Sequence, residues 1–397
     1  MFKVRCLVLM MLAVLLIGVR ADAKEVQPLF GLSKFISNEA DDLLSQSWTK
    51  IQMSDEAAKA YPNLSKALDK YNTEEHDKAM ERQRKYHEEA LTLKQEMPPD
   101  AFRQFYDKSD LIVRRADSTV LSLLEMSEDY LGGVHGMYGC FGVNFDTATG
   151  KRLHISDVCT DAETVVRAIL TRLHEDYPRS PFENAESYVM EQVVKDTLNF
   201  TIEPAGMTVY FNPYEIGSYA EGLFTVTFLF SEYPGLFKDK YKQLPEAYCE
   251  TLTLHYPNIV SFTPGMRNYV QVYIDDDGNY NVGCGGGIAE DQTGLRGLQP
   301  PVLAHMADGT CYLYIDGYID NVGRSLHVYA ISDSKIELVW VLPCTFKDMG
   351  GLKKYETWWI PTDPANVQFY SLEAIEEGGT PMNRQGVVKA DGSFSFG

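Results

Sequence analysis

The sequence has few basic residues for its length. Its 397 residues contain 36 lysines and arginines against 56 aspartates and glutamates, which leaves a formal net charge of −20 at pH 7. A surface of this sign repels nucleic acid and anionic lipid, and it attracts basic proteins. We therefore expect no nucleic-acid partner and consider a basic protein as a partner. Solubility alone is the other explanation for the charge.

Long apolar runs are also absent, except near the N-terminus. Lys3 and Arg5 precede an apolar stretch at 6–19, and the sequence Ala-Asp-Ala ends at Ala23. This is the pattern of a secretory signal peptide, and the stretch is shorter than the roughly 20 residues that a membrane span needs. The pattern predicts cleavage of residues 1–23 and a secreted or extracytoplasmic protein, in the periplasm or at the cell surface, with no transmembrane anchor afterwards. A buried N-terminal helix is the alternative.

Cysteine is scarce and never occurs as Cys-x-x-Cys, so the sequence offers neither a redox motif nor a zinc knuckle. An even number of cysteines in an exported chain permits up to three disulfides. Cys140 and Cys159 flank one predicted turn and could pair locally, and buried free thiols are the alternative. The cysteines that follow the signal peptide are Cys140, Cys159, Cys249, Cys284, Cys311 and Cys344.

Metal-binding and catalytic motifs are missing as well. The acidic segment 275–281 fails as an EF-hand, because glycine stands fourth instead of sixth and the twelfth residue is Gly286 instead of glutamate. Cys284 could form a nucleophilic pair with His305 or His327, but no motif brings these residues together. We therefore predict no catalytic residue, no metal site and no cofactor.

A polar helical segment is predicted near 63–97. Asn72 lies three residues before Glu75, a spacing typical of a helix N-terminus. Apolar residues then recur at helical spacing until Pro98 and Pro99 end the pattern. This narrow apolar stripe consists of Ala79, Tyr86, Ala90, Leu93 and Met97.

The next part of the chain mixes strand and helix patterns, which predicts an α+β fold with an antiparallel sheet and packed helices. The predicted elements are a strand or strand pair at 112–124, a hairpin at 143–155 that turns at Asp146–Gly150, a helix opened by a capping box at Thr160–Glu163 and ending near Tyr177, a second helix at about 186–197, and strands at 206–212 and 222–230.

From about Pro245 the chain carries only strand patterns, which predicts an all-β C-terminal domain, sandwich-like or an incomplete propeller-like array. The sequence thus predicts three segments. They are the signal peptide at 1–23, an α+β domain at 24–244, and a β-rich domain at 245–397.

The loop Asn212–Glu221 joins two strands whose apolar residues alternate, as expected for one buried face. Loops of this kind are the part of a fold that is left free for function. Two tyrosines offer rigid contact area, and two carboxylates complement a basic partner. His135, in a glycine-rich turn, is a further candidate, either as a ligand or as a histidine hydrogen-bonded to its own turn. The predicted ligand-binding residues are Tyr214, Glu215, Tyr219, Glu221 and His135.

Three pieces in order resemble the extracytoplasmic domain of the anti-sigma factor RsiV, which is similar to the non-catalytic region of the peptidoglycan deacetylase PdaC. They are Gly-Gly-x-His-Gly at 132–136, Asn-Phe-Asp followed by Thr-Gly-Lys at 144–151, and Tyr-Phe-Asn-x-Tyr-Glu-Ile at 210–216. The resemblance covers about Tyr61 to Phe237. It implies an α+β domain displayed outside the cytoplasmic membrane and, as in RsiV, binding of lysozyme.

The chain also departs from that family. It has no sigma-binding segment, no membrane span and no deacetylase metal motif. Where the family often has Ala-Pro-Tyr-Ala-x-Gly, this chain has Gly-Ser-Tyr-Ala-Glu-Gly at 217–222, and the missing proline leaves the loop less rigid.

Together these features favour an exported, non-catalytic cell-envelope protein that binds a lysozyme-like protein or peptidoglycan. A secreted hydrolase acting on cell-wall polymer and a structural envelope protein are the alternatives. Trp358 and Trp359 suit stacking on sugar rings, and they suit sheet packing equally well.

Overall fold

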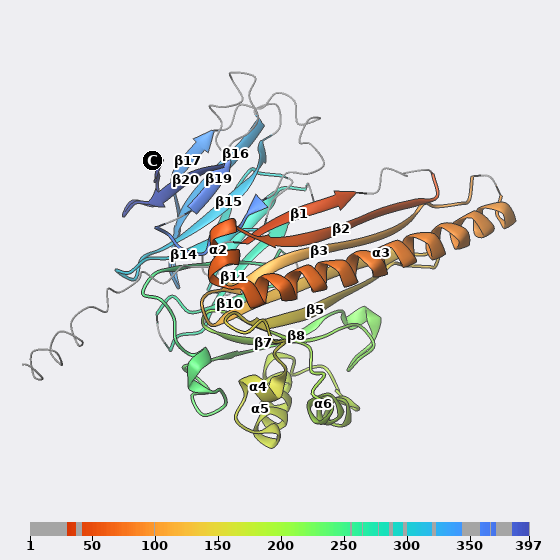
Figure 1. Ribbon diagram of the computed structural model, residues 1–397, viewed down its shortest axis with the longest axis horizontal. Helices are drawn as coiled ribbons and strands as arrows, with labels where there is room; N and C mark the ends of the chain where they lie inside the picture. Colours follow the sequence, from red (N-terminus) through yellow and green to blue (C-terminus); the bar gives the residue numbers. More distant parts are fainter. Residues whose placement is uncertain are drawn as a thin grey trace, which may run out of the picture.

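The computed structural model describes most of the chain after residue 29 (Figure 1). The signal peptide predicted at 1–23 and Cys344 lie outside the described residues. The described ranges are 30–36, 42–98, 100–254, 256–263, 265–276, 278–285, 289–296, 300–319, 323–343, 358–365, 367–370 and 383–396.

The first half of the chain is α+β, as predicted. Its elements, in chain order, are β1 (Phe30–Ile36), β2 (Leu44–Met53), α2 (Asp55–Ala60), α3 (Pro62–Glu96), β3 (Phe105–Ala116), β4 (Val120–Tyr130), β5 (Met137–Asp146), α4 (Ile155–Val158), α5 (Ala162–Asp176), α6 (Ala185–Val194), β6 (Phe200–Ile202), β7 (Gly206–Phe211), the 3-10 helix η1 (Tyr219–Glu221), β8 (Phe224–Leu229) and the 3-10 helix η2 (Asp239–Tyr241).

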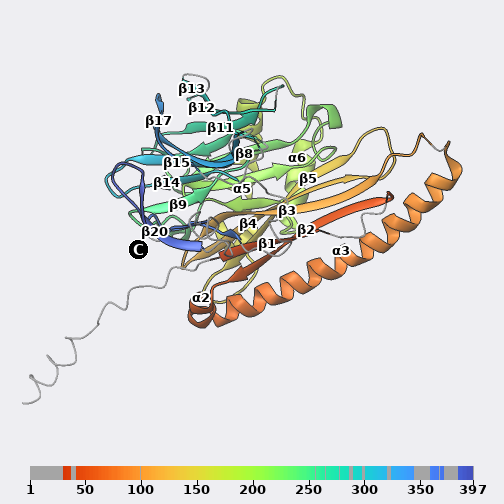
Figure 2. The same cartoon turned by 90° about the horizontal axis from the view of Figure 1, so that it is seen from above.

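The central sheet has the strand order β18-β1-β2-β3-β4-β5, in which β18 is Trp358–Trp359. Most neighbours are antiparallel, but β2 and β3 are parallel, which the sequence patterns did not predict. Parallel neighbours need a long crossover connection, and α2 and α3 provide it. Figures 1 and 2 show α3 lying along one side of this sheet, with β7, β8, α5 and α6 on the opposite side.

Helix α3 lies within one residue of the helical segment predicted near 63–97, but Asn72 is not its N-cap. The helix starts at Pro62, a favourable first position for proline, and Leu64 and Leu68 pack into the core of the sheet. Asn72 lies in the helix interior, where its side-chain amide donates to the Ile51 carbonyl (2.7 Å) and accepts from the Ile51 N–H (3.1 Å). The pairing of β2 with β3 ends at Ser47, so Asn72 satisfies β2 backbone groups beyond that point.

Strand β5 forms one edge of the central sheet, and asparagine side chains join it to the three-stranded sheet β6-β7-β8. Asn199 donates to the Cys140 carbonyl and accepts from the Gly142 N–H, each at 2.7 Å. Asn144 donates to the Phe200 carbonyl at 2.8 Å. A Cβ at Gly142 would lie 1.8 Å from that carbonyl oxygen, so this close approach requires glycine. Backbone groups at this edge of the central sheet therefore find hydrogen-bond partners within the molecule.

Both faces of β7 are buried, although the sequence predicted one core face. Val209 and Phe211 are fully buried in the core formed with α5 and α6, as predicted. Tyr210, on the other face, is also buried, because it packs against Leu124 and Cys140 of the central sheet. Strand β7 therefore lies between the helices and the central sheet.

Two local predictions in this region were wrong. Asp161, not Thr160, caps α5, since its side chain accepts from the Thr164 N–H at 3.0 Å. Thr160 instead donates to the Gly235 carbonyl. The second strand predicted after Gly150 is reduced to a single bridge at Arg152, because a capping box at His154 begins α4 immediately afterwards.

The rest of the described chain is β-rich, as predicted. Its strands are β9 (Tyr248–Thr251), β10 (Asn258–Val260), β11 (Asn268–Ile274), β12 (Tyr280–Cys284), β13 (Ala289–Gln292), β14 (Val302–His305), β15 (Cys311–Ile319), β16 (Gly323–Ile331), β17 (Ile336–Pro343), β18, β19 (Val367–Tyr370), β20 (Asn383–Val388) and β21 (Phe394–Phe396). Sheet β10-β11-β12-β13 shares an apolar core with sheet β17-β16-β15-β14-β9.

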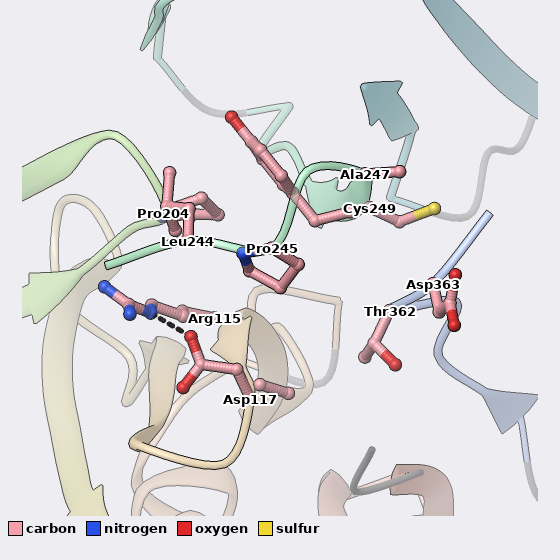
Figure 3. A pocket seen from close by; sticks show the side chains of 11 residues that line it. Arg115, Asp117, Pro204, Leu244, Pro245, Ala247, Cys249, Thr362 and Asp363 are labelled. Atoms are coloured by element: carbon pink, nitrogen blue, oxygen red, sulfur yellow. Dashed lines mark hydrogen bonds and ion pairs between the residues drawn. The ribbon is translucent and has the colours of Figure 1, made fainter. Parts of the chain in front are cut away.

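The two halves contact each other through buried polar groups. Arg114 of β3 donates to the Thr251 carbonyl at 2.7 Å and to the Asn258 side-chain oxygen at 3.4 Å. Figure 3 shows a pocket at this boundary, where Arg115 pairs with Asp117 at 2.6 Å and Thr362 lies across from them. The domain boundary at 244–245 stays a prediction.

Among the described helices, none combines the length and the apolar character that a membrane crossing requires. The described residues also contain no group of three or more histidine, cysteine, aspartate or glutamate side chains that could hold a metal ion.

Candidate functional site

The glycine-rich turn between β4 and β5 meets the loop between β7 and β8. Gly132 has a backbone φ of 83°, a conformation that residues other than glycine rarely adopt. A Cβ at Gly136 would lie 2.6 Å from the Asp129 carbonyl oxygen, so the turn can be this tight only with glycine. The tightness places the His135 ring against the β7–β8 loop.

Four aromatic rings gather at this meeting point. The His135 and Tyr219 rings stack with centroids 3.9 Å apart and planes 22° apart. Tyr138 and Tyr214 each have a ring centroid 5.8 Å from that of Tyr219. The Tyr219 hydroxyl donates to the Gly136 carbonyl at 2.7 Å, which fixes the central ring. We call His135, Tyr138, Tyr214 and Tyr219 the aromatic cluster.

Tyr214 has an unfavourable backbone conformation. The Glu215 N–H donates to the Asn212 carbonyl at 3.1 Å, which closes a turn with Pro213 and Tyr214 in the middle. Tyr214 has φ of 74°, a value at which this turn position favours glycine or asparagine. Its side chain is nevertheless 60% exposed, so packing does not explain the residue.

The two carboxylates of the loop support its backbone. Glu215 accepts from the Asn212 N–H at 2.8 Å, and burial raises its pKa although that hydrogen bond opposes the rise. Glu221 accepts from both the N–H and the hydroxyl of Ser218 at 2.9 Å. Both bonds lower the pKa of Glu221, and the bond from the backbone N–H has the larger effect. Both groups therefore hold the loop in shape.

The surface around the cluster is apolar and acidic. Val134 is fully exposed at the tip of the turn, and Met137 is partly exposed at the start of β5. Glu128 is exposed and lies opposite Tyr138 in the pairing of β4 with β5. An exposed ring, flanking apolar groups and a carboxylate together suit recognition of a partner, because aromatic side chains give large contact area at low entropic cost.

The structure brings together the five residues predicted from sequence. Four of them, Tyr214, Glu215, Tyr219 and Glu221, lie in the β7–β8 loop, and His135 stacks on Tyr219 from the neighbouring turn. Sequence reasoning missed Tyr138. The available signal was its position just after the glycine-rich turn, at the start of a strand.

The structure decides between the alternatives for the disulfides and for a cysteine–histidine pair. The described cysteines, Cys140, Cys159, Cys249, Cys284 and Cys311, are all free and buried. Cys140 does not pair with Cys159, and its sulfur lies 3.3 Å from that of Met126. His305 contacts Cys311 rather than Cys284.

Asp275, at the start of the acidic segment 275–281, bonds to two asparagines of the same segment. The Asp275 carboxylate accepts from the Asn279 N–H at 2.8 Å and from the Asn281 side chain at 3.2 Å. These bonds fit a hairpin turn whose carboxylate is used within the turn, in keeping with the failed EF-hand pattern.

Fold and site define an α+β protein with a surface cluster of aromatic residues beside acidic groups. Residues 158–231 match a family model described as a protein of unknown function (DUF3298). This DUF3298 domain runs from the end of α4 to just after β8. It therefore contains Tyr214 and Tyr219, whereas His135 and Tyr138 precede it. No curated protein matches the chain.

Two solved structures of DUF3298-family proteins are similar to this chain. One, from Bacteroides fragilis NCTC 9343, is 16% identical with a TM-score of 0.39, and the match covers 55% of this chain and 96% of that one. The other, from Pseudomonas aeruginosa PAO1, is 15% identical with a TM-score of 0.36, over 54% of this chain and 95% of that one.

Proposed function

We propose that the protein is exported and binds a partner outside the cytoplasmic membrane through the aromatic cluster, without catalysing a reaction there. The observation that carries this proposal is Tyr214, an exposed ring on a backbone with φ of 74°. Such a conformation costs about 1–3 kcal/mol and persists where the surrounding structure or a function requires it. A ring held in solvent at this cost is better explained by recognition than by stability.

The partner we propose is a basic protein of the lysozyme type. The chain carries a net charge of −20, and Glu128 and Asp129 lie opposite Tyr138 and Met137 in the pairing of β4 with β5. Complementary charge raises association rates and favours a basic partner. The resemblance of the sequence to the lysozyme-binding domain of RsiV supports the same partner.

Isothermal titration calorimetry with a purified lysozyme tests this proposal. We expect binding at 10–20 mM salt that weakens several-fold near 0.15 M salt, where charges further apart than about 8 Å are largely screened. A basic protein of similar size but unrelated fold, such as cytochrome c, serves as the control for charge alone. Absence of heat with lysozyme at low salt, or equal binding of cytochrome c, would contradict the proposal.

Peptidoglycan is the second candidate, favoured by the exposed ring of Tyr214. Tyrosine faces stack on sugar rings, and this mode depends less on ionic strength than charge attraction does. Co-sedimentation with purified sacculi distinguishes the two candidates. Co-sedimentation of the protein that persists at 0.5 M salt favours peptidoglycan. Protein that stays in the supernatant at all salt concentrations excludes it.

Export itself is tested at the N-terminus. Cleavage after the Ala-Asp-Ala sequence would make Lys24 the first residue of the mature protein. Sequencing of protein recovered from outside the cytoplasm should start at Lys24. Recovery of a membrane-bound protein that retains Met1 would refute export as a free protein.

A further inference from the structure

Three side chains form a row across adjacent strands of the C-terminal five-stranded sheet. In the strand register His305 of β14 lies opposite Tyr248 of β9 on one side and opposite Cys311 of β15 on the other. The Tyr248 and His305 rings stack with centroids 4.3 Å apart and planes 19° apart. The sulfur of Cys311 lies 3.5 Å from Nδ1 of His305.

An acid completes the row. Glu250 lies two residues beyond Tyr248 on β9, hence on the same face of the strand. Its Oε1 lies 2.6 Å from Nε2 of His305, so the imidazole bridges a carboxylate and a thiol. A nucleophile, a base and a group that orients the base are the parts of an activated nucleophile.

The charges around His305 favour its protonated form. Burial alone would lower its pKa, but the bonds to Cys311 and Glu250 outweigh burial and raise the pKa to about 9. An imidazolium beside a thiol stabilises the thiolate. Other charged groups interact electrostatically with this row. Arg114, which pairs with Glu203 at 3.4 Å, interacts with Glu250, and Arg115 interacts with Tyr248.

Cys311 differs from the other described cysteines. Burial raises the pKa of the Cys140 and Cys159 thiols to about 12 and also raises the pKa values of Cys249 and Cys284. The hydrogen bonds of the described residues give Cys311, but none of these four, an imidazole partner. Cys249 precedes Glu250 on β9, so it faces the opposite side of the sheet.

The position of Cys311 limits what can reach it. Only 5% of the residue is exposed, but it begins β15 directly after a turn whose residues 307–310 are exposed. A peptide or a sugar chain cannot approach a thiol buried to this degree. A reactant would therefore have to be small, about two or three heavy atoms, and enter beside this turn.

We propose that Cys311 is a reactive thiol, activated by His305 and positioned by Glu250, whose reaction partners are small hydroperoxides. The thiolate attacks one oxygen of the peroxide and the O–O bond breaks, which gives Cys311 sulfenic acid. The sulfur is oxidised by two electrons and the peroxide is reduced. The leaving oxygen, a hydroxide from hydrogen peroxide or an alkoxide from an organic hydroperoxide, takes the proton of the His305 imidazolium and departs as water or as an alcohol.

Site-resolved labelling of the intact, reduced mature protein tests this proposal. The protein is exposed to hydrogen peroxide in the presence of dimedone, which traps sulfenic acid, and peptide mass spectrometry measures each cysteine separately. We expect at least tenfold more adduct at Cys311 than at Cys249 or Cys140. Equal labelling of these sites, or labelling at Cys311 only after denaturation, would overturn the proposal.

Variants distinguish activation of the Cys311 thiol by His305 from simple exposure of that thiol to solvent. His305→Gln should reduce labelling of Cys311 to the level of Cys249, and Glu250→Gln should reduce it several-fold and move the pH at which labelling is half-maximal. Cys249→Ser is the matched control and should leave Cys311 unchanged. If His305→Gln does not fold, as judged by its thermal melt, the comparison among cysteines within the wild-type protein still decides. A folded His305→Gln variant with unchanged labelling would refute activation by the imidazole.

Discussion

At the scale of single residues, the aromatic cluster combines an exposed ring, for which we propose a binding role, with local support of the loop. Tyr214 is exposed and strained, whereas Tyr219 is half-buried, stacked on His135 and bonded to the Gly136 carbonyl. The sequence suggests equal roles for these two tyrosines, because both stand in one polar loop. Only the contact with the β4–β5 turn, which is distant in sequence, distinguishes them.

This difference gives a testable prediction for Tyr219. Tyr219→Phe removes the hydrogen bond to Gly136 and should lower the free energy of unfolding by about 1 kcal/mol. Tyr219→Ala also removes the stacking on His135 and should lower it by about 2–3 kcal/mol in total. Urea unfolding of the two variants measures both values. Equal stability of Tyr219→Ala and the wild type would show that Tyr219 contributes to the surface alone.

At the scale of elements, the alternation of apolar residues in strands and their spacing in helices predicted the features that depend on local burial. Val209 and Phe211 occupy the core as expected, and α5 ends at Asp176, close to the end expected near Tyr177. The role of Asn72 could not be predicted, because its side chain bonds the β2 backbone, a tertiary contact, and does not cap its own helix. The parallel pairing of β2 with β3 has no signature in either strand and depends on the crossover.

Phe211 tests the assignment of the β7 core. Its side chain is fully buried among α5, α6 and β8. Phe211→Ala should lower the free energy of unfolding by about 3–5 kcal/mol, because a large cavity remains. Thermal or urea unfolding measures this loss. A loss below about 1 kcal/mol would mean that the region repacks easily and that the core is not organised around β7.

The interface between α3 and the central sheet predicts a pH dependence. Burial, with Glu75 nearby, raises the pKa of Glu125 from 4.5 to about 7, although Arg82 and Lys78 oppose the rise. The native protein therefore holds an extra proton between pH 4.5 and 7, and stability falls as pH rises through this window. Glu125→Gln should be more stable than the wild type by about 1–2 kcal/mol at pH 8 and similar at pH 4.5. Urea unfolding at both pH values tests this, and an equal difference at both would contradict it.

At the scale of the whole molecule, the boundary between the two halves is exposed but crossed by buried contacts. Residues 243–246 are exposed, whereas buried Arg114 donates to the Thr251 carbonyl across the boundary, and β18 pairs with β1. The sequence predicts two segments from their composition. It cannot predict these contacts, because they join residues more than 100 positions apart.

Limited proteolysis tests both aspects. We expect the first cut between Phe237 and Ala247, and we expect the two fragments to remain together on native size-exclusion chromatography until urea separates them. Cuts confined to Asn63–Met97 would contradict the boundary. Fragments that separate and stay folded without urea would show that the contacts across the boundary contribute little.

The central claim is that the aromatic cluster is a binding surface, and Tyr214→Gly tests it most directly. Glycine tolerates a φ of 74°, so this variant should keep or raise the free energy of unfolding, by about 1 kcal/mol, while it removes the exposed ring. Tyr269→Ala, which removes a partly exposed tyrosine on β11, is the matched control. In calorimetric titrations with lysozyme at low salt, we predict at least tenfold weaker binding for Tyr214→Gly and unchanged binding for Tyr269→Ala. Unchanged binding by a folded Tyr214→Gly variant would contradict the account.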